Sequence, residues 1–310
     1  MPASRTLLIM SGSKRGLAQA APGAGGARPF SPVQQTAFLT CFWRREESLK
    51  PAPLIRDPFA ARPVDAFVAE ETLAEMRASK RKDEAVDLLA CRTAFCDEFV
   101  VEEVGRLTGA AGLQVVALGA GLCSRPYRLH QSCTSDVQWF EVDRDLEVLQ
   151  WKHEVMGADC VGGDSIPTVH SLACDLSQPE QVAKSLLEHP HFSSERPTVF
   201  VMEGLLEYLP QEVHEPLFRA CVESASGGPV SMVMQNLEPQ FAEHFNREGR
   251  LPWQKELVDA SEQEGRLLQL GRGESREVEA LVFRGQDFYE RYGRRIHEGW
   301  TMLTARFGGK

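Results

Sequence analysis

The chain after Gly112 alternates short apolar segments with stretches whose apolar residues repeat at three and four positions. The apolar segments are, in order, QVVAL, VQWFEV, TVHSLAC, TVFVME and PVSMVMQN. Two parallel strands of one sheet need a crossover connection between them, which is usually a helix and is almost always right-handed. The alternation therefore predicts an α/β fold in which a doubly wound, mostly parallel sheet carries helices on both faces.

The flanking regions extend this predicted core. Near the C-terminus, VEALVFRG and GWTMLTARF indicate two further strands around a short helix at QDFYERY, which makes seven strands in all. Residues 31–112 and 238–266 show helical spacing. We expect a flexible tail over residues 1–30 and a single domain over residues 31–310, with helical additions in 31–112 and the sheet in 113–310.

The net charge of the chain limits the classes of partner that we expect it to bind. A net charge of −10 and a pI near 5.4 argue against nucleic acid or an anionic membrane, because phosphate contacts require clustered Lys and Arg. No apolar run approaches the ~18 residues of a membrane span. We expect a cytoplasmic monomer, although the acid-free, basic first 45 residues are also typical of an organelle transit signal. Without a CxxC or HExxH pattern, we expect no metal site.

Glycines and acids follow the first four predicted strands. In open α/β sheets, ligands bind beyond the carboxyl ends of the strands, so these positions are candidate ligand contacts. They are Gly119, Ala120 and Gly121 after the first strand, Glu141 and Asp143 at the end of the second, Asp175 and Leu176 after the third, and Glu203 and Gly204 after the fourth. Glycine lets the backbone approach a ligand closely, and a carboxylate can accept both hydroxyl groups of a ribose.

The same positions indicate which nucleotide would bind. A dinucleotide site would have a third glycine where Ser124 stands, to accommodate a diphosphate. Acids after three successive strands instead suit a ligand that has a ribose, an adenine amine and an ammonium group but no phosphate. S-adenosylmethionine is such a ligand, and we expect it to be the cofactor.

Five ordered segments carry a family resemblance: RTAFCDEF, VVALGAGLCSRPYRL, FEVD, ACDL and MEGLLEYL. With TAFLTCFWRREES and LIRDPFA before them, they resemble the leucine carboxyl methyltransferase family of S-adenosylmethionine-dependent O-methyltransferases from about residue 33 to 225. EGLLEYL and GAGL…R-x-YRL look closer to the family's bacterial small-molecule branch. The resemblance implies a seven-stranded Rossmann-like methyltransferase sheet.

The resemblance also implies a role for individual residues. The implied cofactor contacts are Arg92 at the methionyl carboxylate, Gly119 and Gly121 under the methionine moiety, Asp143 at the ribose, Asp175 and Leu176 at the adenine, and Glu203 on the methionine side. Tyr208, on the helix that follows the fourth strand, would face the substrate cavity and is the candidate catalytic residue. Taken singly, these residues also allow structural interpretations: Asp143 and Asp175 as helix caps, Arg92 as a surface charge and Tyr208 as core.

The acceptor is the least determined part of the prediction. A carboxylate acceptor is ionised at neutral pH and needs no general base. It needs only a cation to position it, and the candidates are Arg44, Arg45 and Arg125. A hydroxyl acceptor would need a general base, and the sequence does not identify one. Cys123 and Ser124 replace the acid and threonine of the family's GAGxDTR pattern, next to the substrate side. We expect a small-molecule carboxylate. A phosphatase C-terminal leucine is the alternative, and an NAD-dependent oxidoreductase or a non-catalytic scaffold would be alternatives from other classes.

Overall fold

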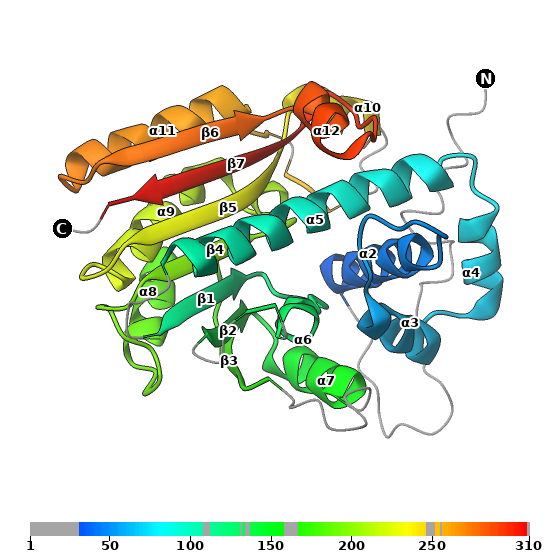
Figure 1. The fold of residues 1–310 in the computed structure, drawn as a ribbon, viewed down its shortest axis with the longest axis horizontal. Helices are drawn as coiled ribbons and strands as arrows, with labels where there is room; N and C mark the ends of the chain where they lie inside the picture. The colour runs from blue at the N-terminus through cyan, green and yellow to red at the C-terminus, as the bar shows by residue number, and fades with distance from the viewer. Residues whose placement is uncertain are drawn as a thin grey trace.

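The computed structural model describes residues 31–107, 112–130, 132–133, 137–157, 167–245, 252–254 and 256–308. The predicted tail over residues 1–30 lies outside this part of the chain. A seven-stranded sheet runs through the middle of the molecule, with helices on both of its faces (Figure 1). The predicted α/β class and the number of strands are confirmed.

The strands follow the spatial order β3-β2-β1-β4-β5-β7-β6. The first five are parallel, and β7 inserts antiparallel between β5 and β6. Their bounds are Leu113–Leu118 (β1), Val137–Asp143 (β2), Val169–Ala173 (β3), Thr198–Met202 (β4), Val230–Leu237 (β5), Val278–Phe283 (β6) and Trp300–Phe307 (β7). The strand order reverses between β1 and β4, so the loops after these strands diverge and leave a crevice at their carboxyl ends.

Helices cover both faces because the central strands are apolar on both. On β1, Val115 packs with the cluster that contains α5 and α12, and Val116 packs with the cluster that contains α8, α9 and α11. The helices of the sheet region are α5 (Lys82–Arg106), α6 (Arg125–Leu129), α7 (Leu146–Gly157), α8 (Pro179–Leu187), α9 (Gln211–Ser224), α10 (Pro239–Phe245), α11 (Ala260–Gly273) and α12 (Gly285–Tyr292). A strand buried on both faces reads as a continuous apolar run, which explains the pattern in the sequence.

The N-terminal helices lie beside one end of α5 and contribute to the crevice (Figure 1). They are α2 (Pro32–Ser48), the 3₁₀ turn η1 (Pro58–Ala60), α3 (Ala61–Phe67) and α4 (Glu70–Arg77). Ser31 and Gln34 form a capping box at the start of α2, which fixes the position where the helix begins. The sequence VDAFVAEETLAEM is not one continuous helix, because Val68 is extended and separates α3 from α4. This break lets Val68 and Leu73 enter the same core cluster.

Two further expectations about helices need correction. Helical structure does not extend through residues 238–266: α10 ends at Phe245, and α11 begins only at Ala260, where the side chain of Asp259 accepts a hydrogen bond from the Glu262 amide. Tyr208 does not lie on the helix after β4 but in a short 3₁₀ turn, η2 (Leu206–Tyr208), that precedes α9. Tyr208 is thereby held next to the end of β4.

Candidate active site

A cavity of about 800 Å³ lies at the carboxyl ends of β1, β2 and β4, and α2 forms one of its walls. This volume is within the range of small-molecule and cofactor sites. All seven of the residues with an implied cofactor role line it, as do Tyr208 and two of the three candidate acceptor cations, Arg44 and Arg125. Arg45 is not part of the lining; it forms an ion pair with Asp65 at 2.7 Å, where the Asp65 side chain is 57% exposed.

The loop after β1 exposes backbone to the cavity because two of its residues are in a conformation that favours glycine. Gly119 has φ +67° and Gly121 has φ +44°. A Cβ on Gly119 would lie 3.0 Å from Leu205 Cδ1, so a side chain there would also be sterically disfavoured. The sequence pattern GAG is therefore required locally by the turn as well as by any ligand above it.

Asp143 connects this loop to the next one. Its Oδ2 accepts a hydrogen bond from the Gly121 amide at 2.8 Å, and its Oδ1 accepts one from the Arg144 amide at 2.7 Å. A carboxylate has about four acceptor positions, so two remain for a ligand in the cavity. The position and the spare acceptors of Asp143 suit the two hydroxyl groups of a ribose.

Glu141, the other acid of β2, has a structural role. It is fully buried on the side of the sheet that faces α7, where Oε2 lies 2.6 Å from Lys152 Nζ and 3.0 Å from His153 Nε2. Burial alone would raise the pKa of Glu141, but the Lys152 ammonium and His153 hold it below its usual value. Glu141 lies within β2 and does not line the cavity, whereas Asp143, the last residue of the strand, lies at its carboxyl end and does.

Asp175 combines a structural contact with a position on the cavity. Its Oδ1 accepts hydrogen bonds from the Ser177 amide at 3.0 Å and from the Ser177 hydroxyl at 2.7 Å, and these bonds lower the pKa of Asp175. The turn formed in this way places Asp175 and the buried Leu176 on the same wall. An apolar side chain beside an ionised carboxylate suits the face and the amine of an adenine.

Arg92 and Glu203 form the wall at the opposite end of this crevice. Arg92 Nε lies 2.8 Å from Glu203 Oε1, and Arg92 Nη1 donates to Gln235 Oε1 at 2.8 Å. Arg125 Nη2 lies 2.6 Å from Glu203 Oε2. Burial raises the pKa of Glu203, but the guanidinium groups of Arg92 and Arg125 outweigh it and hold that pKa far below its usual value. Arg92 is thus oriented by Glu203, with three of its five N–H donors unused by these bonds.

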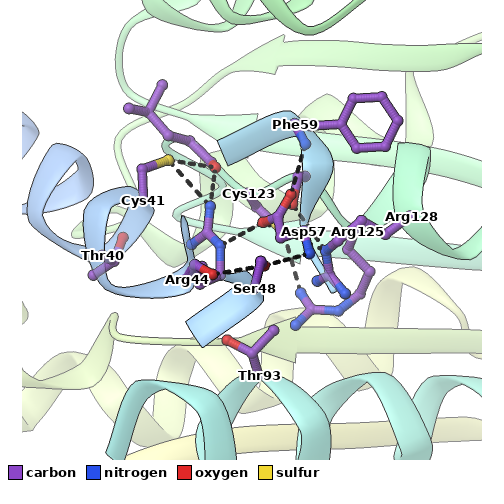
Figure 2. A network of polar contacts seen from close by, with 12 residues as sticks. Thr40, Cys41, Arg44, Ser48, Asp57, Phe59, Thr93, Cys123, Arg125 and Arg128 are labelled. Carbon is purple, nitrogen blue, oxygen red and sulfur yellow. Dashed lines mark hydrogen bonds and ion pairs between the residues drawn. The ribbon is translucent and has the colours of Figure 1, made fainter. Parts of the chain in front are cut away.

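A buried ionic network continues from this wall into the N-terminal helices (Figure 2). Asp57, from the LIRDPFA segment, lies between α2 and α6. Its Oδ2 is 2.8 Å from Arg44 Nε and 3.6 Å from Arg128 Nε. The same oxygen accepts a hydrogen bond from the Ser124 hydroxyl at 2.6 Å. Asp97 on α5 pairs with Arg128 and, at 2.7 Å, with Arg125. No role for Asp57, Asp97 or Arg128 could be predicted from the sequence, because only the tertiary structure brings these segments together.

This network explains the departure from the GAGxDTR pattern. Ser124 retains the hydroxyl group that a threonine would supply, and its Oγ also accepts a hydrogen bond from Arg128 Nε at 2.9 Å. Cys123 Sγ accepts one from Arg125 Nη1 at 3.2 Å and lies on the cavity wall. The network is therefore complete without the family's acid.

Two neighbouring residues of η2 face the cavity. The Tyr208 hydroxyl donates to Thr36 Oγ1 of α2 at 3.2 Å, and burial raises the pKa of Tyr208, so the phenol is neutral. Glu207, which sequence reasoning missed, is only 4% exposed; its Oε1 accepts a hydrogen bond from Gln235 Nε2 at 3.0 Å. Burial raises its pKa to about 7. The only sequence signal for it is an acid within the apolar segment LLEYL.

The fold, the glycine loop and the acid beyond β2 define the chain as an S-adenosylmethionine-dependent methyltransferase, and the comparisons with known proteins agree. The model of the family described as "Leucine carboxyl methyltransferase" matches residues 37–222. The chain belongs to this family.

Proteins with similar sequences are also described as S-adenosylmethionine-dependent methyltransferases. A "Putative S-adenosyl-L-methionine-dependent methyltransferase" of Mycobacteroides abscessus is 33% identical over 243 residues, which are 71% of this chain and 73% of that protein. A protein of Mycobacterium marinum with the same name is 33% identical over 232 residues, 70% and 72% of the two chains. A second M. abscessus relative is 34% identical, and the alignment covers 65% of each chain. The chain is therefore a methyltransferase, and the alternatives of an NAD-dependent oxidoreductase and a non-catalytic scaffold are set aside.

Solved structures share the fold at lower sequence identity. A "putative methyltransferase" from Thermobifida fusca YX superposes with a TM-score of 0.54 and 17% identity, over 93% of this chain and 98% of that one. A "duf574 family protein" from Streptomyces avermitilis gives 0.55 and 13%, over 87% and 97%. Within the described residues, no helix is both long and apolar enough to cross a membrane, and no cluster of His, Cys, Asp or Glu is arranged to hold a metal ion.

Proposed function

We propose that the protein transfers the methyl group of S-adenosylmethionine to a carboxylate oxygen of a small molecule. The observation that carries this proposal is the charge of the buried network at the end of the cavity formed by Arg92 and Glu203. The buried network contains four guanidinium groups and three carboxylates, Glu207 apart, which leaves one positive charge. The cofactor also carries a net positive charge, from a sulfonium, an ammonium and a carboxylate. The positive charge at this end of the cavity would favour an anionic acceptor there.

The residues of the cavity fit the cofactor. Arg92, with its unused donors, would hold the methionyl carboxylate in a bidentate contact, and Glu203 would keep that guanidinium oriented. The loop that contains Gly119 and Gly121 would lie under the methionine moiety, and Asp143 would accept the ribose hydroxyl groups. Asp175 and Leu176 would contact the adenine. When bound, the cofactor supplies an electrophilic methyl group.

The protein's own contribution would be alignment and the exclusion of water. Displacement at a methyl carbon requires the nucleophile in line with the bond that breaks, so holding the acceptor in place supplies much of the rate. Methyl transfer to a carboxylate forms an ester and requires no proton transfer. The contact between Tyr208 on η2 and Thr36 on α2 links two walls of the cavity, which supports a small acceptor rather than a protein C-terminus.

Calorimetric titration with S-adenosylmethionine and S-adenosylhomocysteine, with NAD as the comparison ligand, tests the cofactor site. We expect micromolar binding of the two sulfur nucleotides only. Asp143→Ala should weaken S-adenosylhomocysteine binding at least about tenfold, because charge-assisted hydrogen bonds are lost. Glu154→Gln, an exposed change on α7, is the matched control. Unchanged affinity in folded Asp143→Ala would refute the assignment.

Turnover with isotopically labelled S-adenosylmethionine tests the acceptor class. The probes are hexanoate, octanoate, benzoate and phenylacetate, each paired with the alcohol of the same skeleton, and a peptide that ends in leucine. We expect base-labile methyl esters from the acids. Methylation of the peptide alone would favour the protein acceptor, and base-stable ethers from the alcohols alone would refute the carboxylate proposal.

A further inference from the structure

Glu207 is a buried acid on the cavity wall that forms no ion pair with any of the described residues. Its side chain lines the cavity and belongs to a residue that is 4% exposed. Oε1 accepts the hydrogen bond from Gln235, whereas Oε2 has no hydrogen-bond partner among the described residues. A buried polar atom without a partner costs about 1–3 kcal/mol, so its presence beside a cavity points to a partner supplied by a ligand.

The groups around Glu207 do not hold its carboxyl group in one protonation state. Arg92 of α5 lowers the pKa of Glu207 through its charge, but its Nε is bonded to Glu203, and the Gln235 amide of β5 bridges the two side chains by hydrogen bonds. Tyr208 of the same turn is neutral. From α9, His214 Nε2 lies 3.1 Å from the Leu206 carbonyl oxygen of η2, and burial lowers its pKa, so it too is uncharged near neutral pH.

From the backbone side, Gln254 contacts the turn through uncharged groups. The Gln254 amide donates to the Glu207 carbonyl oxygen at 2.8 Å, and the Gln254 side chain donates to the Tyr208 carbonyl oxygen at 3.0 Å. Gln254 thereby contacts the backbone of η2 at two positions, and Glu207 is the carboxyl group that this turn presents to the cavity. With a pKa of about 7, Glu207 carries a proton over much of the physiological range.

We propose that Glu207 recognises the acceptor: its protonated Oε2 donates a hydrogen bond to the carboxylate oxygen that is not methylated. This inference rests on the proposed carboxylate methylation. Arg44, Arg92 and Arg125 line the cavity and already pair with protein carboxylates, and the unused donors of Arg92 are assigned to the methionyl carboxylate. Glu207 would therefore give the acceptor carboxylate a further donor. An ionised Glu207 has no proton to donate and repels the acceptor, so ionisation switches methyl transfer off.

The step balances without a base. One acceptor oxygen forms the bond to the methyl carbon, the bond between that carbon and sulfur breaks, and its electron pair stays on the sulfur. The products are a neutral methyl ester and S-adenosylhomocysteine. Glu207 keeps its proton throughout. The opposite role, in which an ionised Glu207 removes a proton from a hydroxyl acceptor, would require the opposite protonation state.

Glu207→Gln separates these roles, because glutamine is a neutral donor of nearly the same shape at every pH. The experiment measures kcat/KM for the acids and their paired alcohols as a function of pH. For the wild type, we expect kcat/KM on the acids to fall about tenfold for each pH unit above about 7. Glu207→Gln should lose this decline and exceed the wild type at alkaline pH. Glu212→Gln, an exposed change at the start of α9, should behave as the wild type.

A second readout does not depend on turnover. In the complex with S-adenosylhomocysteine, the infrared difference spectrum between wild type and Glu207→Gln should contain the C=O band of a protonated carboxyl group. Binding of the acids should preserve this band to higher pH, because the bound carboxylate stabilises the protonated form. S-adenosylhomocysteine affinity, measured by calorimetry, confirms that the variant is folded.

The outcomes distinguish failure of this inference from failure of the proposed function. If acids are methylated but Glu207→Gln retains the wild-type pH profile, the role of Glu207 is refuted and carboxylate methylation stands. If alcohols are methylated instead, with a rate that rises with pH and is lost in Glu207→Gln, Glu207 is a base and both proposals fail. An absent carboxyl band below pH 7 also refutes the role of Glu207.

Discussion

Glu207→Gln should change how the stability of the protein depends on pH. Folding raises the pKa of this carboxyl group from 4.5 to about 7, because the buried site disfavours the charged form. A raised pKa contributes stability that is fully present below the unfolded value and is lost as the pH rises through the folded value. The 2.5-unit difference corresponds to about 3 kcal/mol in total, at about 1.4 kcal/mol per unit.

Most of this loss falls in an accessible range. Between about pH 5 and about pH 8.5, the wild type should lose about 2.5 kcal/mol of unfolding free energy because of Glu207, and Glu207→Gln should lose none of this contribution. The acids with lowered pKa, such as Glu203, titrate at lower pH and are common to both proteins, so they cancel in the difference. The residue is buried, so solvent screening does not reduce the effect.

Urea unfolding of both proteins at several pH values measures this difference, provided that the slopes of the transitions agree. The expected result is a stability difference that grows in favour of Glu207→Gln with rising pH. Glu212→Gln should show no such trend, because its side chain is in water in both states. A difference between Glu207→Gln and the wild type that stays constant from about pH 5 to about pH 8.5 would refute the reasoning.

Three further predictions concern the framework of the site. Lys152→Met should cost about 3–5 kcal/mol of unfolding free energy, because it leaves the Glu141 carboxylate buried without its cation 2.6 Å away. Gly204→Ala should cost about 1–2 kcal/mol and weaken S-adenosylhomocysteine binding: φ is +69°, and the new Cβ would lie 3.0 Å from Arg92 Nη1. Ser124→Ala should cost about 1–3 kcal/mol, because a buried carboxylate and a guanidinium lose their shared hydroxyl.

Matched variants check each of these three. Adding Glu141→Gln to Lys152→Met should restore part of the lost stability, and no recovery would contradict the ion-pair explanation. Gly265→Ala, at an open position inside α11, should instead stabilise slightly; equal losses at both glycines would contradict the steric explanation. Ser124→Thr, which keeps the hydroxyl group, should retain more stability than Ser124→Ala in urea unfolding.

The sequence determined the architecture because strand burial and helix periodicity are local patterns. Apolar runs such as VVAL could be recognised as strands buried on both faces, and their alternation with helices specified a parallel sheet and a crevice at its carboxyl end. The positions of Gly119 and Asp143 followed from the same logic, since a residue directly after a strand must lie at that edge. The break between α3 and α4 was missed because helical spacing continues across Val68.

The tertiary structure alone decided which charges meet. Asp57 and Arg128 are 71 positions apart in the chain, yet they lie 3.6 Å apart in the network behind the cavity. Glu141 and Asp143 look equivalent in the sequence, but only the second faces the cavity. Likewise, an acid in LLEYL has no local signature of burial. The electrostatic environment of a group depends on everything packed around it, and long-range packing is not encoded in the spacing of neighbouring residues.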